Sequence, residues 1–556
     1  MPILDSSAFA GADLLPEALR CDVCIIGSGP AGITIARELS GTPIRVTLLE
    51  SGGTERQGKS DVLNEIENVG WPREMDQWAV RNRIVGGSSA TWKARCSAFN
   101  EIDMEQRDWI PYSGWPFQAE DLAAYTDRSA PHLGLGAGNG ITDDRVWELT
   151  GHPRIRTGPD PDPDKLLPQF WQFGRDPVNH YDRIRFSHFI DSLGSNITVV
   201  TNATVLRINA TESANAIASV EFADAGDRRW TLPVGTVALC AGGIENARIL
   251  LSSDNVAPHG LGNDQDLVGR FLMDHLRGAV GRFGPKNTKA VLNQFASFKS
   301  PAAGNNTFQH GMRLSPAIQR AEGLVNCAAW CAEYVSPDDP WENLILLLRR
   351  QPGVRLNLRS MLANSGLMVH GLKEHFISHR ALPRKLEEVA LEAQCEQIPN
   401  RDSRLTLSDR RDRLGMRISR IDWRVSDQEA RTIRRMTELM IEQFSRMGID
   451  PPDIADWVRA GEMFPDTYQD IAHPTGTTRM ADNRALGVVD AQCQVHGVNG
   501  LFIAGSSVFP TAGHANPTQL IVTLAVRLAD TLRHRAIGTG SRAMPLPEAL
   551  ESSTGG

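Results

Sequence analysis

The sequence predicts a protein of mixed α/β and α+β class, in which a domain with a parallel sheet is joined to a second domain built on an antiparallel sheet plus helices. A glycine-rich turn between an apolar strand and a helix, within residues 22–53, indicates the parallel sheet. Two alternating apolar and polar segments within 404–426 indicate antiparallel pairing. A chain of 556 residues that is 41% hydrophobic can fill the cores of about two or more domains.

The charge and composition of the chain argue against several classes of protein. A net charge of −8 and a pI near 6.0 disfavour nucleic acid as a partner. No charged start leads into a secretory apolar segment, and no apolar run reaches the roughly 18 residues of a membrane span, so we expect a cytoplasmic protein. Cys21 and Cys24 are expected in a strand and Cys327 and Cys331 in the core, and no metal site is expected.

The first motif is a G-x-G-x-x-G turn between strand and helix, made by Gly27, Gly29 and Gly32. Gly27 permits the tight turn, Gly29 lets the backbone approach a pyrophosphate, and Gly32 lets the helix pack closely on the strand. The free N–H groups of the helix start favour phosphate. Glu50 ends the next strand, where a carboxylate can accept hydrogen bonds from ribose hydroxyls. The unit therefore predicts a bound dinucleotide, and NAD and FAD both remain open at this point.

The periodicity of apolar residues predicts the secondary structure of several later segments. Residues 195–223 predict antiparallel strands, and 235–253 repeat the order of strand, small-residue turn and helix. Residues 404–426 predict a hairpin and 427–448 an amphipathic helix. Residues 340–394 predict successive helices, which would form either a lid or a subunit contact in an oligomer.

Five separated motifs carry a resemblance to a known family. They are "VGGSSATW" (85–92), "CAGGIENARILLSS" (240–253), "VGRFLMDH" (268–275), "HPTGTTRM" (473–480) and "LFIAGSSVFPTAGHANPT" (501–518). In order and spacing they resemble the glucose-methanol-choline (GMC) family of flavoprotein oxidoreductases. Within that family the chain looks most similar to sugar oxidoreductases of the pyranose 2-oxidase and bacterial glycoside 3-oxidase type.

This resemblance implies FAD as the cofactor and a fold of two intertwined domains. The Rossmann-like FAD-binding domain, of the type shared by GMC enzymes and p-hydroxybenzoate hydroxylase, would be discontinuous. The expected division is 15–110, 195–275 and 468–536 for the FAD-binding domain, 111–194 and 276–467 for the substrate-binding domain with the 340–394 helices inserted, and 537–556 for a disordered tail.

The resemblance also implies which residues contact the cofactor. By motif position, the expected contacts are the backbone of Val205 for the adenine, Gly86, Gly87 and Ser88 for the flavin, and Gly505 and Ser506 for the ribityl chain. Pyranose 2-oxidase bonds its flavin covalently through a histidine that precedes a tryptophan, whereas here Thr91 precedes Trp92. We therefore expect FAD to be held non-covalently.

Alcohol oxidation by flavin requires a base for the hydroxyl proton, while a hydride passes to flavin N5. By motif position the family resemblance implies His473 as the general base and Asn516 as the hydrogen-bonding partner of the substrate oxygen. Pro517 would begin the last helix, whose free amides from Thr518 onward would stabilise the charge of reduced flavin. The alternative for Asn516 is a plain helix N-cap, with Gln519 as its capping-box partner.

The substrate side is less diagnostic. Gln397, on a predicted strand and turn, and His514, near Asn516, are candidate substrate contacts, and His275 is expected to be structural. The leading hypothesis is oxidation of a secondary hydroxyl of a sugar or glycoside to a keto sugar, with O2 or a quinone-type acceptor. The alternatives are a dehydrogenase of a non-sugar alcohol or polyol with a quinone or protein acceptor, and a cyanohydrin-type lyase with structural FAD.

Overall fold

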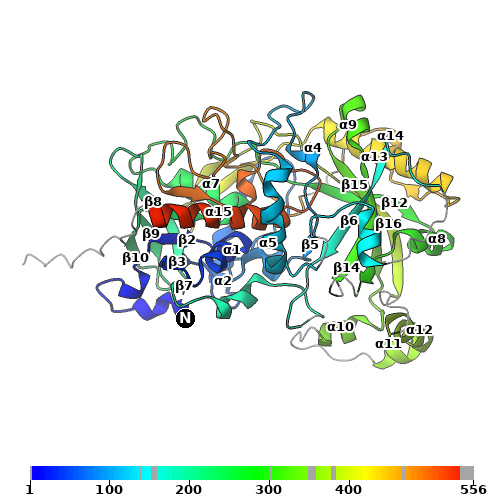
Figure 1. The fold of residues 1–556 in the computed structure, drawn as a ribbon, viewed down its shortest axis with the longest axis horizontal. Helices are drawn as coiled ribbons and strands as arrows, with labels where there is room; N and C mark the ends of the chain where they lie inside the picture. Colours follow the sequence, from blue (N-terminus) through cyan, green and yellow to red (C-terminus); the bar gives the residue numbers. More distant parts are fainter. Residues whose placement is uncertain are drawn as a thin grey trace, which may run out of the picture.

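The parallel sheet and its glycine turn form one half of the molecule (Figure 1). The computed structural model describes residues 3–136, 139–151, 159–179, 181–300, 304, 306–348, 358–376, 384–465, 468 and 470–538. Six parallel strands follow the order β1 (Ile3–Asp5), β7 (Ile197–Thr201), β3 (Val46–Leu49), β2 (Val23–Ile26), β11 (Val237–Leu239) and β20 (Leu501–Ile503). Helix α1 (Pro30–Leu39) packs against the last helix, α15 (Thr518–Gly538), beside this sheet.

A second, antiparallel sheet forms the other half of the molecule, on the right of Figure 1. Its strands follow the order β19 (Asp453–Ile454), β12 (Leu276–Phe283), β16 (Leu386–Cys395), β15 (Cys327–Val335), β14 (Asn306–Leu314), β6 (Leu166–Phe173) and β5 (Arg95–Cys96), and β13 (Phe298–Ser300) pairs with β14. Helix α13 (Asp427–Arg446) packs on β15 and β16 with a buried apolar stripe, as the sequence predicted. The mixed fold class is thereby confirmed, while the exact domain boundaries stay a prediction.

Two smaller sheets complete the frame. Strands β8 (Thr204–Ala210), β9 (Ile217–Ala223) and β10 (Arg229–Pro233) form an antiparallel meander beside the half of the molecule that contains the parallel sheet. The predicted hairpin is β17 (Arg404–Arg411) and β18 (Arg417–Asp422), and β18 pairs in parallel with β4 (Ile66–Asn68). Helix α7 (Gly242–Ser252) follows β11, as the strand, turn and helix pattern predicted.

Two expectations from periodicity are wrong. The 197–201 segment was expected to pair antiparallel, but β7 lies in the parallel sheet, because all five residues are buried and no alternation marks its pairing. Residues 386–394 were expected to continue the helices of 340–394, but they form β16. Every residue from Val389 to Cys395 is buried, so this inner strand lacks the period-two signal that would distinguish it from a buried helix.

The rest of the 340–394 prediction is helical where the structure describes it. Helices α10 (Glu342–Leu348), α11 (Leu358–Ala363) and α12 (Ser365–Phe376) lie below the antiparallel sheet in Figure 1. Residues 349–357 and 377–383, and the predicted tail from residue 539 onward, lie outside the described residues. None of the described helices combines the length and apolar character needed to cross a membrane.

Candidate functional site

One cavity of about 430 Å³ runs between the two halves of the molecule. At one end it is lined by the glycine turn after β2 and the carboxylate at the end of β3. At the other end it is lined by His473 and Asn516. The segments that the sequence analysis singled out separately thus meet around a single space of the size that holds a small-molecule ligand.

The glycine turn has the conformation that a bound diphosphate requires. Gly27 has φ of +97°, and a Cβ on it would lie 2.7 Å from the Cys240 carbonyl oxygen. A Cβ on Gly32 would lie 1.9 Å from the Gly27 carbonyl oxygen, so only glycine lets α1 pack this closely. A Cβ on Gly29 would meet nothing within 4 Å, because this residue faces the cavity at the N-terminus of α1.

Glu50 lies at the end of β3, where the ribose of a dinucleotide is expected. Its side chain accepts hydrogen bonds from Ser28 N at 2.9 Å, Ser28 Oγ at 2.6 Å and Gly52 N at 2.8 Å. Burial raises the pKa of this carboxyl, against the effect of those hydrogen bonds. Glu50 also lines the cavity, so the carboxylate that braces the glycine turn is within reach of the ligand.

The other predicted cofactor residues gather around the same cavity. Those that line it are Gly87, Ser88, Val205, Gly505, Ser506, Pro517 and Thr518. Gly86 does not line it, but has φ of +91° and shapes the adjoining turn. A Cβ on Gly87 would lie 2.8 Å from Gly29 Cα, so the two glycine loops touch each other. The cradle of glycines, the Glu50 carboxylate and the α1 N-terminus together fit a dinucleotide.

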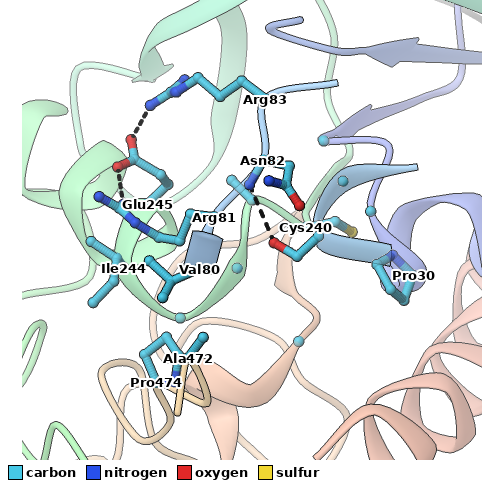
Figure 2. Close-up of a pocket in the computed structure, with 18 of the residues that line it drawn as sticks. Pro30, Val80, Arg81, Asn82, Arg83, Cys240, Ile244, Glu245, Ala472 and Pro474 are labelled. Carbon is cyan, nitrogen blue, oxygen red and sulfur yellow. Dashed lines mark hydrogen bonds and ion pairs between the residues drawn. The ribbon is translucent and has the colours of Figure 1, made fainter. Parts of the chain in front are cut away.

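A buried ion cluster that the sequence analysis missed closes one wall of the cavity (Figure 2). Arg81 and Arg83, which follow helix α3 (Gln77–Val80), bind the Glu245 carboxylate of α7 at 2.9 Å and 2.8 Å. Burial alone would raise the pKa of Glu245, but these arginines and Arg248 lower it to about 2. These ion pairs fix the segment after α3 against α7. In the sequence, the cluster is indicated only by two arginines just before the "VGGSSATW" motif.

His473 and Asn516 are brought together, as the resemblance implied. Asn516 Nδ2 lies 3.4 Å from His473 Nε2, and both residues line the cavity. The Asn516 side-chain oxygen has no hydrogen-bond partner among the described residues although it is buried. An imidazole nitrogen and an amide with a free oxygen therefore face the same ligand space.

His275, expected to be structural, is the neighbour that determines which His473 nitrogen carries the proton. His275 Nε2 lies 2.9 Å from the Gly513 carbonyl oxygen, which can only accept, so this nitrogen must carry a hydrogen. In a neutral imidazole His275 Nδ1 is then an acceptor, and it lies 3.0 Å from His473 Nδ1. His473 therefore donates through Nδ1 and keeps the lone pair of Nε2 toward the cavity.

Electrostatics keep this histidine chain neutral. Burial, followed by the neighbouring His275, Arg277 and Arg95, lowers the pKa of His473 well below its usual value. Burial lowers the pKa of His275 to about 4. A neutral imidazole is the state that a general base needs, and the lone pair of His473 Nε2 accepts only the long contact from Asn516 Nδ2 at 3.4 Å among the described residues.

The two candidate substrate contacts do not line the cavity. The Gln397 amide is used within the protein: its oxygen accepts from Asp274 N and Trp423 Nε1, both at 2.8 Å, and its nitrogen donates to the Arg424 carbonyl at 2.6 Å. His514 is buried, with neither ring nitrogen hydrogen-bonded to the described residues. Gln397 therefore has a bracing role here, since its amide joins Asp274 to the segment between β18 and α13.

Comparison with known proteins agrees with the geometry. Residues 399–525 match the GMC oxidoreductase family, and residues 20–97 match an FAD binding domain family. The chain is thus similar in sequence to GMC oxidoreductases. It is therefore an FAD-binding oxidoreductase, as the five motifs implied.

Relatives of this protein span almost its whole length. Paromamine 6'-oxidase of Streptomyces fradiae is 23% identical and covers 92% of this chain and 91% of its own. Fructose dehydrogenase large subunit of Gluconobacter japonicus is 23% identical, covering 93% of this chain and 98% of its own. In fold the protein resembles a formate oxidase, with a TM-score of 0.56 and 17% identity over 93% of this chain and 99% of that one.

The glycine turn predicts two different outcomes for neighbouring alanine substitutions. Gly29→Ala adds a methyl group that has room in the protein but occupies the path of the diphosphate, so we expect unchanged thermal stability without FAD and FAD binding weakened about tenfold or more, a loss of about 1.4 kcal/mol. Gly32→Ala forces α1 away from β2, and a destabilisation of about 1–3 kcal/mol or more is expected.

Gly58→Ala is the matched control, because its methyl group meets nothing within 4 Å. Thermal unfolding of the apoproteins and titration with FAD distinguish the variants. Weakened folding in Gly29→Ala, or unchanged folding in Gly32→Ala, would contradict this account of the turn.

The lowered pKa of His473 predicts how the reaction depends on pH. A base must be unprotonated, so substrate-driven flavin reduction should hold its rate as pH falls through about 6.5, the ordinary histidine value, and decline only in more acidic solution. Stopped-flow absorbance under anaerobic conditions measures this profile. A half-maximal rate at pH 6.5 or above would show that the base is not a buried, depressed histidine.

Proposed function

We propose that this enzyme oxidises a secondary hydroxyl of a sugar or glycoside to a keto sugar, and passes the electrons to O2 or another acceptor. The observation that carries the proposal is the pair made by His473 Nε2 and Asn516 Nδ2 in the cavity. The sugar class is supported by relatives named for sugar-derived substrates, among them paromamine 6'-oxidase and fructose dehydrogenase. The choice of a secondary hydroxyl rests on the resemblance to glycoside 3-oxidase-like enzymes.

In this proposal His473 holds and moves the proton of the reaction. Its Nε2 lone pair accepts the proton of the substrate hydroxyl, because Nδ1 is turned toward His275 and unavailable. Bound FAD supplies the hydride acceptor, at flavin N5. Asn516 orients the substrate oxygen through its amide, which keeps the reacting carbon in place as negative charge grows on that oxygen.

Helix α15 completes the site by directing its N-terminus at the cavity. Pro517 precedes the helix, and Thr518 begins it, with both residues lining the space. The partial positive charge of the helix end stabilises negative charge there by about 0.3–2 kcal/mol. A buried face that includes Leu524 and Leu528 anchors the helix, so this end is held in a fixed direction.

FAD is proposed to be held without a covalent bond. Thr91 occupies the position where pyranose 2-oxidase has its flavin-linked histidine, and its hydroxyl donates to Asn82 Oδ1 at 2.7 Å. A threonine hydroxyl at that position offers no imidazole nitrogen for such a link. We propose that the glycine turn, Glu50 and the N-terminus of α15 bind the cofactor instead.

Acid precipitation tests the mode of attachment. Unfolding removes every non-covalent contact, so all of the yellow colour should appear in the supernatant, measured by its absorbance and by the mass of the released cofactor. Colour that remains with the washed protein pellet would contradict non-covalent binding.

Anaerobic absorbance spectra test the proposed reaction. Monosaccharides and glycosides are added one at a time, together with non-sugar diols, since a Mycolicibacterium austroafricanum relative is named 2-methyl-1,2-propanediol dehydrogenase. Bleaching by a sugar or glycoside supports the proposal, and bleaching by diols alone overturns the sugar assignment. Admission of air then separates oxidase from dehydrogenase by the rate at which the band returns. A cyanohydrin lyase would show no bleaching with any alcohol.

His473→Ala tests the base. We expect the variant to bind FAD normally but to lose flavin reduction by about 100-fold or more, the usual effect of a missing general base. His259→Ala, an exposed histidine away from the cavity, serves as control. A reduction rate close to that of the unmodified protein would remove His473 from the role.

A further inference from the structure

The antiparallel sheet presents a positively charged face to the cavity. Ladder register places Arg95 of β5 opposite Phe173, and Arg277 of β12 opposite Gln394 of β16. Because residues opposite each other and residues two apart share a face, Arg95 and Arg277 lie on one side of the sheet, together with Trp171, Trp330 and Glu392. Lys93, Arg95 and Arg277 all line the cavity that holds His473.

Arg277 is neutralised locally. Its Nε donates to the Glu392 carboxylate at 2.7 Å, and the other Glu392 oxygen accepts from the Tyr334 hydroxyl. Burial alone would raise the pKa of Glu392, but the charge of Arg277 keeps it below its usual range. The Glu392 carboxylate is therefore already engaged by two hydrogen-bonding partners.

Arg95 makes no hydrogen bond to a carboxylate among the described residues, although the charge of Glu392 acts on it. Its side chain is 7% exposed, and its Nε and Nη2 are buried without a hydrogen bond. Its guanidinium carbon lies 4.0 Å from the centre of the Trp171 ring and 3.9 Å from that of Trp330, so two aromatic faces hold it in place. A guanidinium that is held rigidly but lacks a hydrogen-bonded anion has a large desolvation cost in the ligand-free protein.

The remaining carboxylates that line the cavity are engaged by other partners. Glu50 is bonded to Ser28 and Gly52, Glu245 is enclosed by Arg81, Arg83 and Arg248, and Asp412 binds Arg248 at 2.7 Å. The diphosphate of the cofactor is expected beside Gly29, at the N-terminus of α1. Neither source supplies an anion to Arg95, which is close enough to His473 for its charge to lower the pKa of the imidazole.

We infer that the substrate is an acidic sugar, whose carboxylate or phosphate group binds Arg95 while a hydroxyl of the same molecule reaches His473. This inference rests on the proposed sugar oxidation and narrows its substrate class. Lys93, which lines the same region, adds positive charge. A guanidinium held in one orientation by two tryptophan faces can bind an oxyanion through charge-assisted hydrogen bonds.

Matched sugars test the inference. Methyl glucoside, methyl glucuronide and glucose 6-phosphate differ in the charge at one carbon, and anaerobic flavin reduction gives kcat/KM for each. We expect an acidic member to exceed the neutral one by about 10- to 100-fold, the range of a hydrogen bond to a charged group. A preference for glucuronide identifies a carboxylate, and a preference for the sugar phosphate identifies a phosphate.

Arg95→Gln removes the charge and should abolish this preference, while Arg95→Lys should retain most of it. Arg313→Gln is the control, because Arg313 is also a buried guanidinium with nitrogens that lack partners but does not line the cavity. If Arg95→Gln fails to fold, the comparison of acidic and neutral sugars in the unmodified protein decides the matter alone.

Two outcomes would overturn the inference. If neutral and acidic sugars reduce the flavin equally well, sugar oxidation stands and the anion site does not. If Arg95→Gln shifts the flavin reduction potential and slows the reaction with every substrate alike, Arg95 is assigned to the cofactor instead. If no sugar of any charge bleaches the flavin, the proposed sugar oxidation itself is wrong. This outcome differs from equal bleaching by neutral and acidic sugars, which contradicts only the anion site at Arg95.

Discussion

The site depends on one buried carboxylate, that of Asp274. It accepts hydrogen bonds from the backbone N–H of His275 at 2.8 Å and from that of His473 at 3.0 Å, and it pairs with Arg73 Nη2 at 3.0 Å. Burial, and then the nearby Asp470, raise the pKa of Asp274, while Arg73 opposes that shift. A buried charge is tolerated only where it is paired and fully hydrogen-bonded, so this arrangement fixes both histidine-bearing segments at once.

Through Asp274, the two halves of the molecule share the active-site residues. His275 precedes β12 of the antiparallel sheet, whereas His473 and Asn516 come from segments that flank β20 of the parallel sheet. The glycine turn would hold the cofactor on one side, and the face with Arg95 would hold the substrate on the other. The histidines meet between them, which is where a hydroxyl, a base and a hydride acceptor have to converge.

Much of the half that contains the parallel sheet could be predicted from the sequence, because its key residues lie close together in the chain. The glycine turn and Glu50 lie within one short βαβ unit, and each residue has a reason that follows from backbone conformation or hydrogen bonding. His473 and Asn516 could be found because whole motifs surround them. The β16 strand could not, because complete burial removes the periodicity that distinguishes strand from helix.

Contacts between segments far apart in the chain could not be predicted from the sequence. The bond between His275 and His473 joins residues far apart in the chain, and nothing near "MDH" identifies its partner. The sequence analysis selected Gln397 as a substrate contact because it is a polar residue on a predicted strand and turn. In the structure its amide is hydrogen-bonded to Asp274, Trp423 and Arg424 instead. Arg95 was overlooked for the opposite reason, since a missing partner can be recognised only once every neighbour is in place.

The protonation state of His473 can be measured without knowing the substrate. Nitrogen-15 chemical shifts of the FAD-loaded protein labelled at histidine, assigned with a His473→Ala sample, report which ring nitrogens carry hydrogen. At pH 7 a neutral ring with the proton on Nδ1 and a bare Nε2 is expected. A proton on Nε2, or a doubly protonated ring, would contradict the role of His473 as the base.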